Sequence, residues 1–263
     1  LKAIMAEKNI SEKKAKKLIL QSIDPIAWLE LLLGFDEDSK DLPDMDQQWY
    51  LRWYQKAMIR CTAKNQVYRC GRRSGKSSSA ALKIVHWMFN NKVFSARDAE
   101  GNELWKGPEI AIITPFQSQI SNIFQEIERF ILLNKDLKTE VIQTGAKLYR
   151  QTPPLAMHFK NGGVIKGYVT GSNSKDDGSA GGSIRGMTAD IIYVDEMDII
   201  PDSVFEKVIR PILLSKPKTM LLCSSTPIGK KGTFYKYCVE DTEFKEFYFP
   251  STVIPHWDQE EKS

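Results

Sequence analysis

The sequence predicts an α/β fold in which helices flank a mainly parallel sheet. One apolar strand pattern leads into a glycine- and serine-rich loop at residues 70–78, and a helical pattern follows it. Two further continuous apolar runs, 110–113 and 191–194, are typical of strands buried on both faces of a parallel sheet. With 263 residues, 42% of them hydrophobic, the chain is long enough for one substantial core and a modest second part.

Composition narrows the class of protein. The net charge of +4 is too small to indicate a nucleic-acid partner by itself. The cysteines lack zinc-site spacing, so we expect reduced thiols in a cytosolic protein, and no apolar run is long enough to predict a membrane span. The chain begins at Leu1 rather than Met, from which we expect a trimmed or partial sequence.

The N-terminal part is predicted to be helical. Helices are expected over 11–22, 26–33 and 47–61, with Asp24 as the N-cap of the second and an acidic, proline-broken loop over 36–46. Lysines of the first helix are interpreted as a solvated face rather than a DNA contact.

The loop at residues 70–78 has the pattern of a phosphate-binding P-loop. Lys76 is expected to reach the β- and γ-phosphates, and the Ser77 hydroxyl to bind Mg²⁺. Cys70 stands where the motif has its first glycine, so we expect a negative φ there. A chance Gly-Lys-Ser in a basic turn is the alternative, and the flanking strand and helix patterns argue against it. The nucleotide-binding residues predicted in the loop are Gly71, Arg73, Ser74, Gly75, Lys76, Ser77 and Ser78.

Tyr54 and Gln55 precede this loop by about twenty residues. An aromatic ring can stack on adenine, and a Gln amide offers a donor and an acceptor to the base edge. The same pair on a helix is more often simple packing, and only its position before the P-loop favours a nucleotide contact.

The middle of the chain alternates strands, helices and loops. We expect a hairpin or excursion over 90–107, a helix over 118–134 and a glycine-turn hairpin over 156–168. The glycine- and serine-rich loop 171–186 is too long to be a passive connection and is predicted to carry function.

Two acids end the strand 191–194. Asp195 is expected to hold the Mg²⁺ opposite Ser77, and Glu196 to orient or deprotonate the attacking water. Asp198 is the competitor for that second role. A strand that simply ends in a polar turn is the alternative.

The last predicted strand of the core, 220–223, is followed by three hydroxyl side chains: Ser224, Ser225 and Thr226. Side chains at the carboxyl ends of parallel strands face the ligand crevice, so these hydroxyls are candidates for sensing the γ-phosphate. The same residues are also an ordinary way to leave a strand, and both interpretations stay open.

Arginines near the phosphates are candidates for stabilising the transition state. Arg72 and Arg73 lie in the P-loop and could act within the same chain. Arg185, in the long loop, could reach the nucleotide of a neighbouring subunit. A surface salt bridge is the alternative for each.

Taken together, these motifs resemble the ATPase part of the large terminase subunit, the DNA-packaging motor of tailed phages. The resemblance rests on Tyr54-Gln55, the loop GRRSGKS, residues 183–186 ahead of IIYVDE, and the Ser224-Ser225-Thr226 motif, and it spans about residues 24–249. Order and spacing all fit.

The resemblance implies an ASCE-type, RecA-like P-loop NTPase that uses ATP and Mg²⁺. It implies that Glu196 is the catalytic glutamate, and that Arg72 and Arg185 match the arginines proposed to act in cis and in trans. It also implies a lid subdomain, from which we expect a helical segment 1–46, an ATPase core 47–232 and a lid or linker segment 233–263.

The same resemblance implies the partners. They are double-stranded DNA, the portal protein and the small terminase subunit, in the host cytoplasm and without a membrane. The expected assembly is a homo-oligomeric ring, with a monomer as the form in isolation. Full-length members continue into a nuclease domain, and we expect no nuclease activity in this chain. The lysines proposed to contact DNA are Lys160, Lys166, Lys175, Lys230 and Lys231.

Two other functions compete with this one. A superfamily 2 helicase-like ATPase shares the P-loop and a Thr-Pro strand end, but it normally needs a second RecA-like domain. A nucleotide-dependent assembly module would bind ATP without hydrolysing it, and Glu196 argues against that.

Overall fold

The computed structural model describes residues 24–33, 51–143, 145–170, 184, 188–216 and 218–253. The predicted helix over 11–22, the loop 36–46 and nearly all of the loop 171–186 lie outside these residues. The chain divides into two compact units, Leu1–Cys61 and Thr62–Ser263. No helix in the described residues is long and apolar enough to cross a membrane.

The first unit contains two described helices, α3 (Pro25–Leu33) and α4 (Trp53–Arg60). The Asp24 carboxylate accepts a hydrogen bond from Ile26 N, which confirms its predicted capping role. It also pairs with Arg60 of α4 at 2.7 Å, and this contact lowers the pKa of Asp24. Helix α4 thus belongs to the unit that ends at Cys61, and the domain bounds expected from the sequence stay a prediction.

The second unit is built on an eight-stranded sheet in the order β10-β1-β9-β8-β4-β7-β6-β5. The six strands from β10 to β7 are parallel to one another, while β6 pairs antiparallel with β7 and β5 antiparallel with β6. Their bounds are β1 Asn65–Cys70, β4 Glu109–Thr114, β5 Val141–Ile142, β6 Leu155–Phe159, β7 Val164–Val169, β8 Ile191–Asp195, β9 Met220–Ser225 and β10 Phe244–Phe249. The predicted mainly parallel sheet is confirmed.

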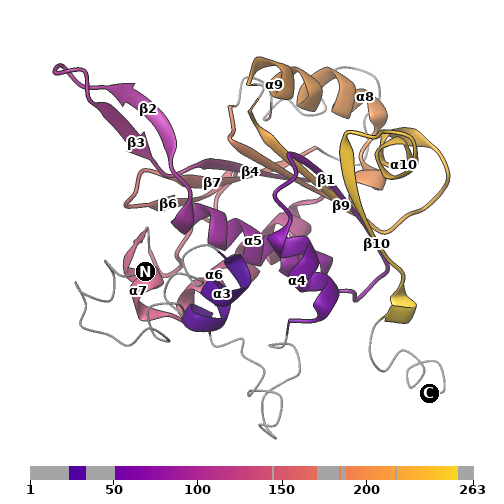
Figure 1. Cartoon of the computed structure of the whole chain (residues 1–263), viewed down its shortest axis with the longest axis horizontal. Helices are drawn as coiled ribbons and strands as arrows, with labels where there is room; N and C mark the ends of the chain where they lie inside the picture. Colours follow the sequence, from indigo (N-terminus) through magenta and orange to yellow (C-terminus); the bar gives the residue numbers. More distant parts are fainter. Residues whose placement is uncertain are drawn as a thin grey trace, which may run out of the picture. The chain divides into compact units, whose positions relative to one another are not determined.

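Helices cover both faces of this sheet (Figure 1). On one side lie α5 (Lys76–Asn90) and α6 (Gln117–Leu132), and on the other α9 (Arg210–Ser215) and α10 (Gly232–Val239), with the short α8 (Asp202–Val204). A π-helical turn, Phe205–Ile209, joins α8 to α9, and the short α7 (Lys135–Thr139) precedes β5. Burial on both faces explains why β8 is an unbroken apolar run.

A two-stranded hairpin, β2 (Val93–Arg97) and β3 (Glu103–Lys106), confirms the predicted excursion over 90–107. It forms a sheet of its own and extends away from the main sheet (Figure 1). The hairpin predicted over 156–168 is β6 and β7, which join the main sheet beside β4.

The sheet includes residues that lie beyond the predicted core segment 47–232. Residues 244–249, expected in a lid or linker, form β10, which pairs with β1 along its whole length. The aromatic residues of this strand pack on the sheet, as in the edge-on contact of Phe247 with Tyr68. Residues 244–249 are therefore part of the main sheet.

Shortening one buried side chain of β8 tests which residues form the core of the second unit. Ile192 of β8 is fully buried in the apolar cluster under α9, so Ile192→Ala is expected to lower the free energy of unfolding by roughly 2–5 kcal/mol. Leu104→Ala, on the exposed face of the β2–β3 hairpin, should change it by less than about 0.5 kcal/mol. Urea unfolding of both variants measures this, and similar losses would contradict the assigned core.

Candidate nucleotide site

The P-loop lies between β1 and α5. The backbone adopts positive φ at Arg73 (59°) and at Gly75 (80°), and α5 begins at the next residue, Lys76. Its first turn holds no acidic residue and no side-chain cap, so the positive end of the helix dipole is left for an external anion. The predicted strand, loop and helix are therefore all present.

The structure explains the cysteine at the start of the motif. Cys70 is the last residue of β1 and has no positive φ, as expected, and burial raises the pKa of its thiol to about 11. Gly71 is needed for another reason: a Cβ there would lie 2.5 Å from Ser251 N and 2.9 Å from its Cα. The glycine is therefore required by close packing against the turn after β10.

Asp195 ends β8 directly beside the P-loop helix. Its carboxylate accepts a hydrogen bond from Ser224 and lies 3.4 Å from the Ser77 hydroxyl. The buried Tyr193 hydroxyl is 3.0 Å from the same Ser224 Oγ. Burial raises the pKa of Asp195, an effect that the Ser224 hydrogen bond and the charge of Lys76 offset only in part.

This pair of oxygen ligands fits a magnesium ion. A serine hydroxyl and a carboxylate are the hard oxygen donors that Mg²⁺ takes, and the ion usually completes its shell with water and substrate phosphates. The described residues contain no cluster of three or more His, Cys, Asp or Glu side chains around it. The donor set therefore fits a metal shared with a nucleotide rather than an all-protein cage.

Glu196 is held in a strained backbone conformation, with φ 49° and ψ 45°. One carboxylate oxygen pairs with Lys76 Nζ at 3.1 Å, and the other accepts from the Ser225 hydroxyl at 3.2 Å. Lys76 Nζ is also 3.4 Å from Thr226 Oγ1. The predicted phosphate lysine, catalytic acid and hydroxyl motif thus meet at one point.

The order of the strands produces this meeting. β9 lies between β1 and β8, so its carboxyl end carries Ser224, Ser225 and Thr226 to a position between the P-loop and the two acids. Ser224 faces Asp195 in register, and all three hydroxyls contact a residue of the site.

The other residues predicted for the nucleotide site do not all lie beside Lys76 and Glu196. Ser78 donates to Glu126 of α6 at 2.9 Å, so its hydroxyl is engaged with the neighbouring helix. Arg72 and Arg73 are exposed, and Arg72 lines a hollow of about 330 Å³ with Gly71 and Thr226. Arg185 lies outside the described residues.

Tyr54 and Gln55 belong to the first unit. Both are buried; Gln55 Oε1 accepts from Arg52 N at 3.0 Å, and the Tyr54 hydroxyl accepts from the Arg52 guanidinium. The glutamine thus helps to cap the start of α4. Their contact with adenine stays a prediction.

Among the proposed DNA contacts, Lys160, Lys230 and Lys231 are exposed. Lys166 is partly buried in β7 and pairs with Glu109 at 2.8 Å, which raises its pKa and engages its charge. Lys175 lies outside the described residues. Lys166 is therefore the weakest of these candidates.

Two acids near the site were missed by sequence reasoning in their present roles. Asp198 and Asp202 accept hydrogen bonds from the backbone amides of Ile228 and Thr233. Neither contact has a sequence signature, because the partners are about thirty residues apart and join through backbone groups.

The fold and the site together define a P-loop NTPase with a mainly parallel sheet. The family model described as terminase large subunit, T4likevirus-type, N-terminal, matches residues 67–259. The chain therefore belongs to the large terminase subunit family and matches the N-terminal part of its members, which confirms the resemblance found in the sequence.

Individual relatives agree with this assignment. The large terminase subunits of Thermus phage G20c and Thermus virus P23-45 are 30% and 29% identical over 188 and 187 residues, in each case 70% of this chain. The chain matches about 35% of the length of each of these relatives. The large terminase ATPase domain of Thermus phage P74-26 has the same fold, with a TM-score of 0.60 and 24% identity over 81% of this chain and 86% of that one.

The close approach at Gly71 can be tested by adding one methyl group. Gly71→Ala forces the P-loop or the turn at Ser251 to move, so we expect a loss of roughly 1–3 kcal/mol of stability and weaker binding of an ATP analogue. Gly229→Ala, where nothing lies within 4 Å of the added carbon, is the matched control and should stay within about 0.5 kcal/mol. Equal behaviour of the two variants in urea unfolding would contradict this packing.

Asp195 is expected to contribute to nucleotide binding but to lower the stability of the folded chain. Because burial raises its pKa, the ionised carboxylate disfavours the folded state at pH 7, so Asp195→Asn is expected to raise the melting temperature. The gain should shrink as the pH falls through the raised pKa, where the wild-type carboxyl is already protonated. The same variant should lose Mg²⁺-dependent nucleotide binding. Thermal unfolding across pH measures the first effect, and a lower melting temperature at pH 7 would contradict it.

Proposed function

We propose that this chain hydrolyses ATP with Mg²⁺ and that, in the assembled motor, hydrolysis drives double-stranded DNA into a procapsid. One observation supports this most: Lys76 and Ser77 on the P-loop lie within 3.1 Å and 3.4 Å of Glu196 and Asp195 at the end of β8. A phosphate lysine, a metal-binding pair and a general base are thereby collected in one place.

The residues of the chain have distinct parts in this reaction. Lys76 and the P-loop amides bind the phosphates, and Ser77 and Asp195 would hold the metal, which would supply positive charge to offset that of the phosphates. Water attacks the γ-phosphorus, the bond to the bridging β-phosphate oxygen breaks, and Glu196 accepts the proton of the water.

The ion pair between Lys76 and Glu196 indicates how the base is released. Lys76 Nζ lies 3.1 Å from one Glu196 carboxylate oxygen. A γ-phosphate carries more charge than a carboxylate and competes for the same ammonium group. Nucleotide binding therefore frees that oxygen to face the attacking water.

The arginines and the partners belong to the same proposal. Arg72 acts in cis on the transferred phosphoryl group, and Arg185 acts in trans in a homo-oligomeric ring, so an isolated subunit hydrolyses slowly. Tyr54 and Gln55 read the adenine, and the segment 1–46 contributes to a lid. Double-stranded DNA, a portal protein and a small terminase subunit are the partners in the host cytoplasm, and the chain itself has no nuclease activity.

A variant that lacks the general base Glu196 but keeps the nucleotide-binding residues tests the proposed hydrolysis directly. Glu196→Gln is expected to bind an ATP analogue with wild-type affinity and to lose about 10²–10⁴-fold in hydrolysis rate. Lys76→Ala should lose binding as well, because the phosphates lose their lysine. Glu206→Gln, which changes an exposed acid paired with Arg210, is the control and should hydrolyse normally. A wild-type chain that binds but never hydrolyses, even with DNA and portal, would favour the assembly module instead.

A further inference from the structure

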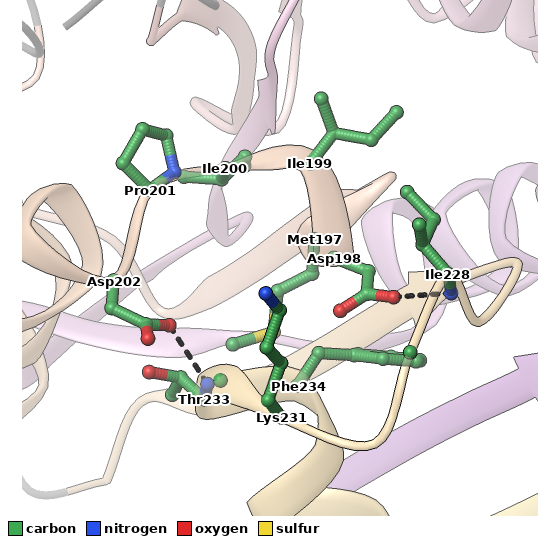
Figure 2. Close-up of a pocket in the computed structure, with 12 residues that line it drawn as sticks. Met197, Asp198, Ile199, Ile200, Pro201, Asp202, Ile228, Lys231, Thr233 and Phe234 are labelled. Atoms are coloured by element: carbon green, nitrogen blue, oxygen red, sulfur yellow. Dashed lines mark hydrogen bonds between the residues drawn. The ribbon is translucent and has the colours of Figure 1, made fainter.

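The segment that follows Glu196 forms one wall of a pocket of about 450 Å³. Figure 2 shows the residues around it: 197–202 come from the turn after β8, and 228, 229 and 231–234 from the loop after β9 and the start of α10. The two segments follow the catalytic acid and the hydroxyl motif respectively. The pocket therefore separates two chain segments that both lead directly out of the nucleotide site.

Two acidic side chains connect these segments across the pocket. Asp198 Oδ2 accepts from Ile228 N at 2.6 Å, and Asp202 Oδ1 accepts from Thr233 N at 2.7 Å, as the dashed lines in Figure 2 show. Hydrogen bonds from a backbone amide to a charged acceptor are among the stronger ones in proteins. The loop that carries Lys230 and Lys231 is thus anchored on both sides.

Only the first of these two connections continues to the nucleotide site. Asp198 N donates to Ser225 Oγ at 3.3 Å, and Ser225 Oγ donates to Glu196 Oε2 at 3.2 Å. The Thr226 carbonyl, at 3.3 Å, is the second acceptor within reach of that hydroxyl. Because Asp198 N occupies a lone pair of Ser225, the serine proton is turned toward these acceptors.

From this arrangement we infer that Asp198 is a positioning residue for the proposed hydrolysis. Its carboxylate fixes the loop after Thr226, and its backbone amide fixes the Ser225 hydroxyl, which in turn orients the Glu196 carboxylate. The same geometry assigns the base: the Asp198 carboxylate is engaged by Ile228 N, whereas Glu196 contacts Lys76. This inference rests on the proposed function and names a residue that acts through Glu196.

Three variants of the whole chain test it. Asp198→Ala keeps the backbone amide that contacts Ser225 but removes the carboxylate that ties this amide's residue to Ile228 N. The amide is then less firmly held beside Ser225, so kcat should fall by about 10- to 100-fold, while KM and the affinity for an ATP analogue stay within about threefold. Asp198→Asn keeps an oxygen acceptor and should restore kcat to within about threefold of wild type. Asp202→Ala loses the matching amide contact without a link to Ser225, so it should lower the melting temperature and leave kcat nearly unchanged.

The results distinguish a positioning role of Asp198 from a direct role in the chemistry, and both from a failure of the proposed function. If Asp198→Asn is as slow as Asp198→Ala, the charged carboxylate itself does the chemistry and the positioning role is overturned; an unchanged kcat in Asp198→Ala overturns it too. If Asp198→Ala does not fold, Ser225→Ala removes the middle link and must show the same fall in kcat at constant KM. Absence of hydrolysis by the wild-type chain refutes the proposed function itself, whereas wild-type turnover with an indifferent Asp198→Ala refutes only this inference.

Discussion

The parallel register of three neighbouring strands is the constraint on which the site depends. β9 pairs with β1 on one side and β8 on the other, so the P-loop, the hydroxyl motif and the two acids all emerge at one edge of the sheet. Asp195 faces Ser224 directly in this register. A one-residue slip of β9 would turn Ser224 and Ser225 to the opposite faces and break their contacts with Asp195 and Glu196.

The buried charge of Asp195 at this edge of the sheet lowers the stability of the folded chain. Asp195 is buried, and its two oxygens rely on the hydroxyls of Ser224 and Ser77 rather than on a direct cationic partner. The raised pKa records that these contacts do not fully replace water. A metal bound between Ser77 and Asp195 would supply the missing positive charge, which is why an acid in this environment is informative about function.

The strained backbone of Glu196 also favours a functional role for this edge of the sheet. A non-glycine residue with φ near 49° is rare, and here the turn lets the chain carry Glu196 toward Lys76 and then continue into the segment 197–202. That segment is held to the loop after β9 by two carboxylate-to-amide hydrogen bonds. Glu196 and the hydroxyl residues 224–226 are therefore parts of one connected structure rather than separate motifs.

The sequence by itself determined the class of fold, the strand-loop-helix of the P-loop, the acids after β8 and the hydroxyls after β9, because apolar runs and glycine-rich loops report local structure. It could not determine that β9 lies between β1 and β8, that Gly71 is required by Ser251, or that residues 244–249 complete the sheet. Tertiary structure decided these points because each depends on hydrogen bonds or close packing between segments far apart in the chain, which leave no periodic pattern in the sequence.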